Sequence, residues 1–92
     1  MDKVQKLELM DKIQRELKDL EQSQTAVLKK VSQIAAHNIN LSAELLDQKL
    51  PDLQESIDAT VIAISGISEA FEEYRNQFFN DNNMGAKLDP TA

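Results

Sequence analysis

The stretch LPDLQESIDATVIAISGISEAFEEYRNQF, residues 50–78, decides the predicted fold. Along it, side chains that suit a helix seam recur at alternating spacings of three and four, at Leu50, Leu53, Ile57, Thr60, Ile64, Ile67, Phe71, Tyr74 and Phe78. Side chains at this spacing share one face of an α-helix. The stretch therefore predicts a long helix that packs along one side against another helix.

The first half of the chain carries a similar period. Two heptad rows run from its start, one with Met10, Leu17, Gln24, Val31, Asn38 and Leu45, the other with Ile13, Leu20, Val27, Ile34 and Leu41. A sustained period of 3.5 residues predicts coiled-coil-like packing. The polar positions Gln24 and Asn38 either fix register or partner number, as polar seam residues do in coiled coils, or mark points where the seam drifts.

The connection between the two helices is predicted from Pro51 and the residues after it. Proline disfavours helical geometry in the preceding residue, and Asp52 followed by Glu55 has the form of a capping box. The predicted boundaries are a helix over residues 3–46, a turn over 47–51, a helix over 52–80 and a disordered tail over 84–92, with residues 1–83 forming one domain. An earlier break near residues 37–40, giving three helices, is the alternative, because Asn is a good helix cap.

Composition assigns the chain to the all-α class. Its 92 residues contain two Gly, two Pro and 4% aromatic residues, and helix formers dominate the rest. The fold class expected is an antiparallel two-helix hairpin with a long first helix and a shorter second one. An isolated hairpin has a single helix contact in which to bury a wide apolar stripe, so we expect it to complete a four-helix bundle on dimerisation.

The residue types argue against an enzyme. Cysteine is absent and His37 is the only histidine, so no thiolate or paired imidazole site can form. The acids Glu69, Glu72 and Glu73 flank Phe71 and suit a solvated helix face. We therefore expect no catalytic residues, no metal, no cofactor and no small-molecule substrate.

Charge and hydropathy exclude two further classes of partner. The net charge is −6, and residues 51–92 hold two basic residues against eight acidic ones, which disfavours nucleic-acid binding. The longest uncharged run, residues 59–68, is about half the length needed to span a bilayer. The first residues carry mixed charge instead of an apolar core, so we expect no cleavable secretory signal and a cytoplasmic location.

A predicted length mismatch points to a protein partner. A helix over residues 3–46 would be about 65 Å long and one over 52–80 about 43 Å, so the first turns of the longer helix would overhang. The neighbours Phe78 and Phe79 cannot both face the seam, which makes one of them a partner anchor. The predicted partner-binding residues are Val4, Leu7, Met10, Ile13, Leu17, Phe78 and Phe79. The partner expected is another helical protein or a second copy, in a heterodimer or a homodimer.

The chain is small and acidic, with a predicted turn between Leu46 and Asp52 and a polar tail. In this outline it resembles the small helical-hairpin proteins of type VII secretion, of the Esx type or the related effector-associated partners. The resemblance implies a dimerising partner, targeting factor or chaperone for another protein, and export without a cleavable signal peptide. The family's Trp-x-Gly turn signature is replaced here by residues 48–51, and Tyr74 is followed four residues later by Phe78 instead of an acid. The alternative hypothesis is a structural coiled-coil subunit of a cytoplasmic or phage assembly with no export role.

Overall fold

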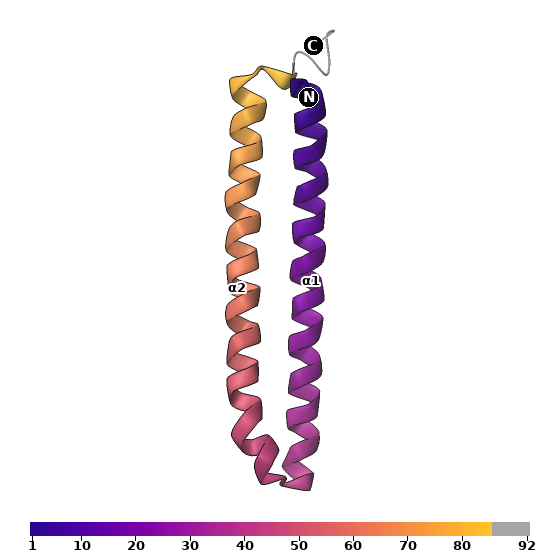
Figure 1. The fold of residues 1–92 in the computed structure, drawn as a ribbon, viewed down its shortest axis with the longest axis vertical. Coiled ribbons are helices and arrows are strands. Elements are labelled where there is room, and N and C mark those ends of the chain that lie inside the picture. Colours follow the sequence, from indigo (N-terminus) through magenta and orange to yellow (C-terminus); the bar gives the residue numbers. More distant parts are fainter. Residues whose placement is uncertain (86–92) are drawn as a thin grey trace.

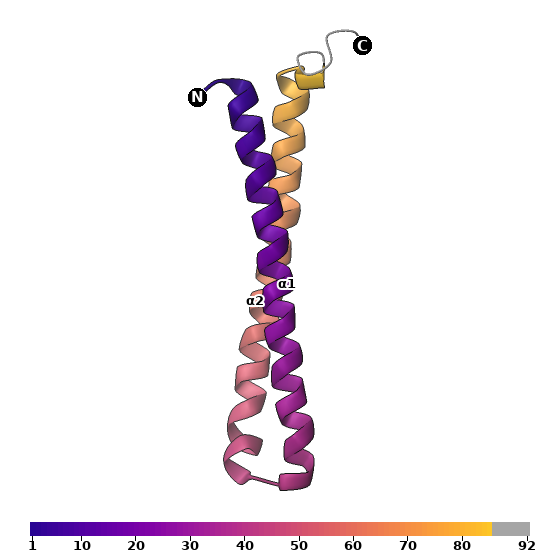
Figure 2. The ribbon, with the colours of Figure 1, turned by 90° about the vertical axis from the view of Figure 1, so that its right-hand side faces the viewer.

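The protein is a two-helix antiparallel hairpin. The computed structural model describes residues 1–85, and within them the chain forms α1 (Lys3–Leu41) and α2 (Glu44–Asp81). The helices lie side by side along a rod with extents of 66, 22 and 17 Å (Figure 1), and they cross near the middle of their lengths (Figure 2). The all-α class and the hairpin predicted from the heptad period are confirmed.

A capping box starts α1. The Asp2 carboxylate accepts the N–H of Gln5 at 2.7 Å, and the Gln5 side-chain oxygen accepts the N–H of Asp2 at 3.0 Å. These reciprocal bonds satisfy backbone donors that have no partner within the first helical turn. They fix the first turn of α1 at Lys3.

The turn lies at Ser42 and Ala43, so the predicted turn over residues 47–51 is wrong. Ser42 adopts a left-handed conformation (φ 58°, ψ 40°) and its N–H donates to the carbonyl of Asn38 at 2.7 Å. This geometry ends α1 at Leu41. The alternative of an earlier break, near residues 37–40, is closer to the observed turn.

The buried side chain of Asn38 explains why α2 starts so early. Ala43 has no side chain with which to cap α2, and Asn38 supplies one from α1: its Oδ1 accepts the N–H of Ala43 at 2.9 Å. Its Nδ2 donates to the Asp47 carboxylate at 2.7 Å. The acids Glu44 and Asp47 in the first turn also suit the positive end of the helix dipole.

Pro51 lies inside α2, so the predicted start of the second helix at residue 52 is also wrong. Its ring cannot donate to the carbonyl of Asp47, and α2 bends near its start (Figure 1). Both Asp52 and Glu55 are exposed on the helix and do not mark its beginning. The helix continues through Pro51 because the Asn38 cap fixes its first turn.

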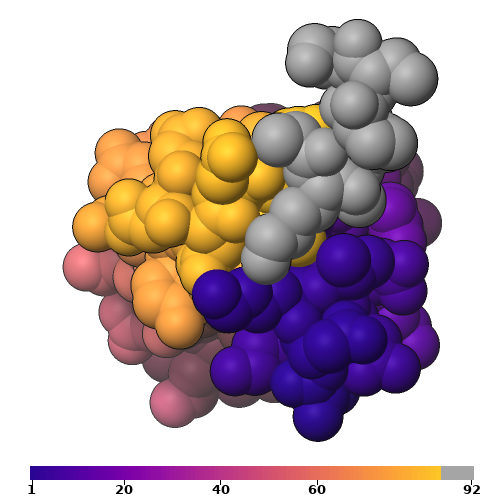
Figure 3. Space-filling view, turned by 90° about the horizontal axis from the view of Figure 1, so that it is seen from above, coloured from indigo at the N-terminus to yellow at the C-terminus, as the bar shows by residue number. Residues whose placement is uncertain are grey.

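The predicted overhang of the first helix does not exist. The two helices contain 39 and 38 residues, and the end of α2 lies against the start of α1 (Figure 3). Leu7 is only 3% exposed. The tail predicted for residues 84–92 lies outside the described residues except for Met84 and Gly85, of which Met84 is fully buried.

The contact between the helices uses two rows from each helix. On α1 the inner rows are Leu7, Gln14, Glu21, Leu28 and Ala35, and Met10, Leu17, Gln24, Val31 and Asn38. On α2 they are Leu50, Ile57, Ile64, Phe71 and Phe78, and Val61, Ser68, Arg75 and Asn82. All of these side chains are buried or half-buried. One predicted row on each helix is therefore correct, and the other predicted row lies outside the contact.

Candidate functional site

One largely apolar heptad row of each helix is directed away from the contact between the helices. On α1 this row is Ile13, Leu20, Val27 and Ile34, and on α2 it is Leu53, Thr60, Ile67 and Tyr74. Ile13 is half-buried, whereas Leu20 is 45% exposed, Ile67 is 56% exposed and Tyr74 is 61% exposed. These eight residues are called the apolar face below.

Both rows of the apolar face lie on the same side of the hairpin. On each helix, every member of the row comes three residues after an inner-row residue, as Ile13 follows Met10 and Tyr74 follows Phe71. A step of three residues along the chain moves a side chain around the helix axis in the same direction on both helices. Because the two helices are antiparallel and face each other, this step brings both rows to the same side of the hairpin. The hairpin is therefore amphipathic as a unit.

A groove at one end of the apolar face confirms this placement. Met10 and Ile13 from α1 and Phe71 and Tyr74 from α2 line a single groove between the helices, together with Met1, Lys6 and Leu9. The rings of Phe71 and Tyr74 are stacked with centroids 5.8 Å apart. Side chains from both helices thus meet on one side and leave an apolar surface open there.

The borders of the apolar face carry little charge. On α1 the neighbouring row is Leu9, Glu16, Ser23, Lys30 and His37, and on α2 it is Lys49, Ser56, Ala63, Ala70 and Gln77. All of these residues are exposed. Between Leu53 and Tyr74, no acidic residue of α2 lies in the apolar face or in this border. The acids of α2 in this range are directed to its other sides.

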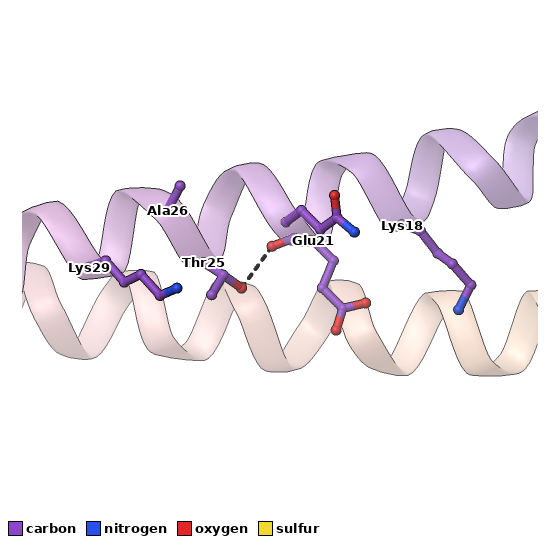
Figure 4. Close-up of a pocket in the computed structure, with 6 residues that line it drawn as sticks. Lys18, Glu21, Thr25, Ala26 and Lys29 are labelled. Carbon is purple, nitrogen blue, oxygen red and sulfur yellow. Dashed lines mark hydrogen bonds between the residues drawn. The ribbon is translucent and has the colours of Figure 1, made fainter.

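The opposite side of the hairpin is polar. Along α1 it carries Lys18, Glu21, Thr25 and Lys29, which line a shallow groove (Figure 4). The Thr25 hydroxyl donates to the carbonyl of Glu21 at 2.9 Å. Charges of both signs lie together here in water, an arrangement typical of a solvated helix face. This side offers no apolar surface comparable to the apolar face.

Polar contacts between the helices set their rotation about their own axes. Gln14 Nε2 donates to the carbonyl and hydroxyl oxygens of Ser68 at 3.0 and 3.2 Å. Arg75 Nε forms a salt bridge with Asp11 Oδ1 at 2.8 Å. The inner rows therefore contain hydrogen-bonded polar residues, while one largely apolar row of each helix faces outward. Three apolar rows exceed what one helix contact can cover, and these bonds determine which rows remain outside.

The predicted partner-binding residues do not form one exposed surface. Leu7 is buried in the contact with α2, and the others are half-buried: Val4, Met10, Ile13, Leu17, Phe78 and Phe79. The Arg75 guanidinium carbon lies 5.0 Å from the Phe79 ring centroid, a cation–π contact that covers this ring. The overhang is absent, so a mismatch in helix length does not support a partner site at these residues. Partner binding by these residues stays a prediction, and Ile13 alone of them belongs to the apolar face.

The residues that make up the apolar face were placed in the seam by their sequence spacing. The signal that separates them from the inner rows is the polar pair Gln14 and Ser68, which has no apolar character and yet is part-buried. On α1 a row of mixed polar and apolar residues lies beside the purely apolar row of Ile13, Leu20, Val27 and Ile34, and this is the sequence sign of a second, outward surface.

Within residues 1–85, no group of three or more His, Asp and Glu side chains is arranged to hold a metal ion. In the same part of the chain, neither helix has a stretch of sufficient length and hydropathy to cross a bilayer. His37 and the three acids Glu69, Glu72 and Glu73 are all exposed.

Comparisons with protein-family models, with curated proteins and with solved structures found no match for this chain.

Proposed function

We propose that this chain is a non-enzymatic protein-interaction module that docks another helical chain on its apolar face. One observation carries the proposal: both helices turn a largely apolar heptad row to the same exposed side. Aliphatic and aromatic side chains in water gain roughly 25 cal/mol for each Å² of apolar surface that a partner covers. A contiguous apolar surface of this kind marks an interaction site.

The biological role proposed is that of a dimerising partner, targeting factor or chaperone for another protein in bacterial type VII secretion. Support comes from the hairpin architecture, the chain length and the acidic composition, which are those implied by the family resemblance. Such a role places the chain in the cytoplasm, with export without a cleavable signal peptide as part of the hypothesis.

The second candidate is a structural coiled-coil subunit of a cytoplasmic or phage assembly. It is favoured by the departures from the secretion family: the chain has no Trp, and Phe78 stands where an acid would complete the motif begun by Tyr74. Deleting residues 86–92 in the native cell separates the two roles. A secretion partner should lose export and keep its complex. For a structural subunit, the deletion should affect neither the location of the chain nor its complex.

The interaction itself is tested with a matched pair of substitutions on α2. Ile67, in the apolar face, is 56% exposed, and Ile62, on another side of the same helix, is 65% exposed. With Ile67→Glu, the chain in its native cell should shift from a complex to a single chain, as measured by native mass determination. With Ile62→Glu the complex should persist. Equal loss from both variants would refute docking on the apolar face.

A further inference from the structure

We infer that the apolar face is covered by a second copy of this chain, laid face to face with its turn at the opposite end of the rod. This inference rests on the proposed function and names the partner that occupies the face. Five observations carry it: the charge along the border of α1, the apolar pairing within the face, the level at which the two helices have their centres, the small residues along α2, and the area of the face.

The border of α1 is complementary to itself when reversed. Glu16 and Lys30 lie equally far from Ser23, seven residues on either side. If a two-fold axis passes at Ser23, Glu16 of each copy faces Lys30 of the other copy. The dimer then contains two opposite-charge pairs. Leu9 and His37 lie at equal distances from the same point. A two-fold interface requires this kind of self-complementarity.

The apolar rows match around a point half a residue from Ser23, a displacement of about 0.75 Å along the helix. On α1, Ile13 meets Ile34 of the second copy and Leu20 meets Val27, each pairing one aliphatic side chain with another. On α2, the row is symmetric about Thr60, so Leu53 meets Ile67 of the second copy. Side chains that pair in this way fill the space between antiparallel helices without burying a charge.

The two centres lie at one level of the hairpin, which a single axis requires. The bonds Gln14–Ser68 and Ser32–Gln54 join the helices above and below the middle. Midway between them, Ser23 on α1 is level with residue 61 of α2, about one residue, or 1.5 Å, from Thr60. The centre of symmetry of α1 and the centre of symmetry of α2 therefore lie at the same level of the hairpin, although the two helices have independent sequences.

Packing along α2 suits the same arrangement. Its border row contains Ser56, Ala63 and Ala70, whose small side chains allow two copies of α2 to approach closely. The net charge of the chain is −6, yet no acid of α2 between Leu53 and Tyr74 lies on this side, so the second copy meets no acidic surface. A basic client protein would find no acids to pair with on the apolar face.

The area is sufficient for a stable dimer. The apolar face of α1 runs from residue 13 to residue 34, about 32 Å at 1.5 Å per residue. The hairpin is 22 Å wide across its two helices. A rectangle of this length and width has an area of roughly 700 Å², of the same order as the ~800 Å² that each partner buries in a standard specific interface.

The reverse orientation, with both turns at one end, lacks this complementarity. In it α1 of one copy lies against α2 of the other, at the same levels as within a hairpin. Lys30 then meets Ser56, Glu16 meets Ala70, and His37 lies close to Lys49. No opposite-charge pair forms in this orientation.

Charge reversal on the purified chain tests the inference, with dimer affinity measured by sedimentation equilibrium and helix content by circular dichroism. Lys30→Glu and Glu16→Lys should each weaken the dimer about tenfold, because two attractive pairs become repulsive. The double variant Glu16→Lys/Lys30→Glu should restore affinity to within about threefold. Lys29→Glu is the matched control, because it makes the same charge change on the polar side and should leave affinity unchanged.

A disulfide test fixes the orientation. The chain has no cysteine, so Thr60→Cys introduces a single thiol. With the turns at opposite ends, Thr60 faces Thr60 across the axis and oxidation should give a covalent dimer; with the turns together these positions are roughly 10 Å apart at usual helix spacings, beyond disulfide reach. Ile62→Cys should stay monomeric on a non-reducing gel.

Three results would overturn the inference: a wild-type chain that remains monomeric at ~100 μM, a concentration at which even weak specific dimers form; equal weakening by Lys29→Glu and Lys30→Glu; or failure of the double variant to recover. A monomeric wild-type chain combined with loss of the native-cell complex in Ile67→Glu would mean that a different helical protein occupies the face. In that case the proposed function stands while the second copy is rejected.

Discussion

Gln14 on α1 and Ser68 on α2, 54 residues apart in sequence, are joined by two hydrogen bonds across the contact between the helices. Gln14 Nε2 donates to the carbonyl oxygen of Ser68 at 3.0 Å and to its hydroxyl oxygen at 3.2 Å. The Oε1 atom of Gln14 is buried and accepts no hydrogen bond from the described residues. A buried acceptor without a partner costs about 1–3 kcal/mol, so this pair orients the helices at some expense in stability.

Replacing both members of this pair by apolar residues should stabilise the protein. In Gln14→Leu/Ser68→Ala the unpaired acceptor disappears, and the free energy of unfolding should rise by about 1 kcal/mol. Ser68→Ala alone removes one acceptor and should lower it by roughly 0.5–1 kcal/mol. Urea unfolding at one fixed protein concentration measures both. A double variant less stable than Ser68→Ala would mean that the polar pair is a net source of stability.

The same pair explains which part of the fold was predictable from the sequence. The spacing of Met10 and Leu17, or of Ile57 and Ile64, predicts helices, their antiparallel contact and one inner row on each. It places the rows of Leu20 and Ile67 in the contact as well, because apolar rows are expected to be buried first. Two rows flank the first inner row of each helix, and either could join the contact as the second inner row. Hydrogen bonds such as Gln14–Ser68 determine which of the two does so. Those bonds join residues far apart in sequence, so no local pattern reveals them.

Asn38 should be the polar residue whose loss is most damaging. It is 4% exposed, and its side chain bonds the N–H of Ala43 and the carboxylate of Asp47. In Asn38→Ala the start of α2 loses its cap, and the free energy of unfolding should fall by about 1–3 kcal/mol. Asn40→Ala, at an exposed position of the same helix, is the control and should change it by less than about 0.5 kcal/mol. Comparable losses in the two variants would contradict the capping role.

This cap also accounts for the misplaced turn. From the sequence, Asn38 either fixes register or marks a point where the seam drifts, an Asn cap near residues 37–40 gives the alternative break, and Pro51 marks the predicted boundary. The interpretation of Asn38 missed its second role, because a side chain that caps the next helix from five residues upstream belongs to no short motif. Pro51 misled for a related reason: a proline ends a helix only when nothing else holds the turn before it.

Ser42 should gain from replacement by glycine. Its φ of 58° is a left-handed conformation that costs an L-residue about 1–2 kcal/mol and costs glycine almost nothing. Because glycine also loses more backbone freedom on folding, Ser42→Gly should raise the free energy of unfolding by a net ~0.5–1 kcal/mol. Ala36→Gly, on an exposed helical site, should lower it by about 1 kcal/mol. Thermal unfolding of the two variants should thus shift in opposite directions, and a fall in both would rule out strain at Ser42.

The salt bridge between Arg75 and Asp11 should contribute little. Its side chains are 26% and 40% exposed, so water and salt screen much of the attraction. Asp11→Asn should lower the free energy of unfolding by less than about 1 kcal/mol, and the difference from wild type should vanish in 1 M NaCl. Urea unfolding with and without salt measures this. A larger loss that persists in salt would mean that Asp11 acts through a hydrogen bond and not through its charge.

Pro51 should destabilise α2, because it lies in the helix interior and cannot donate to the carbonyl of Asp47. In Pro51→Ala that hydrogen bond is restored, at the cost of a more flexible unfolded chain. The net result should be a gain of about 1–2 kcal/mol in the free energy of unfolding, with a higher helix content by circular dichroism. Asp52→Ala is the control: a residue that capped the start of a helix would cost about 1 kcal/mol on removal, whereas exposed Asp52 inside α2 should cost less than about 0.5. If Pro51→Ala lost stability and Asp52→Ala lost as much, the second helix would start at Asp52 and the turn would span residues 47–51 after all.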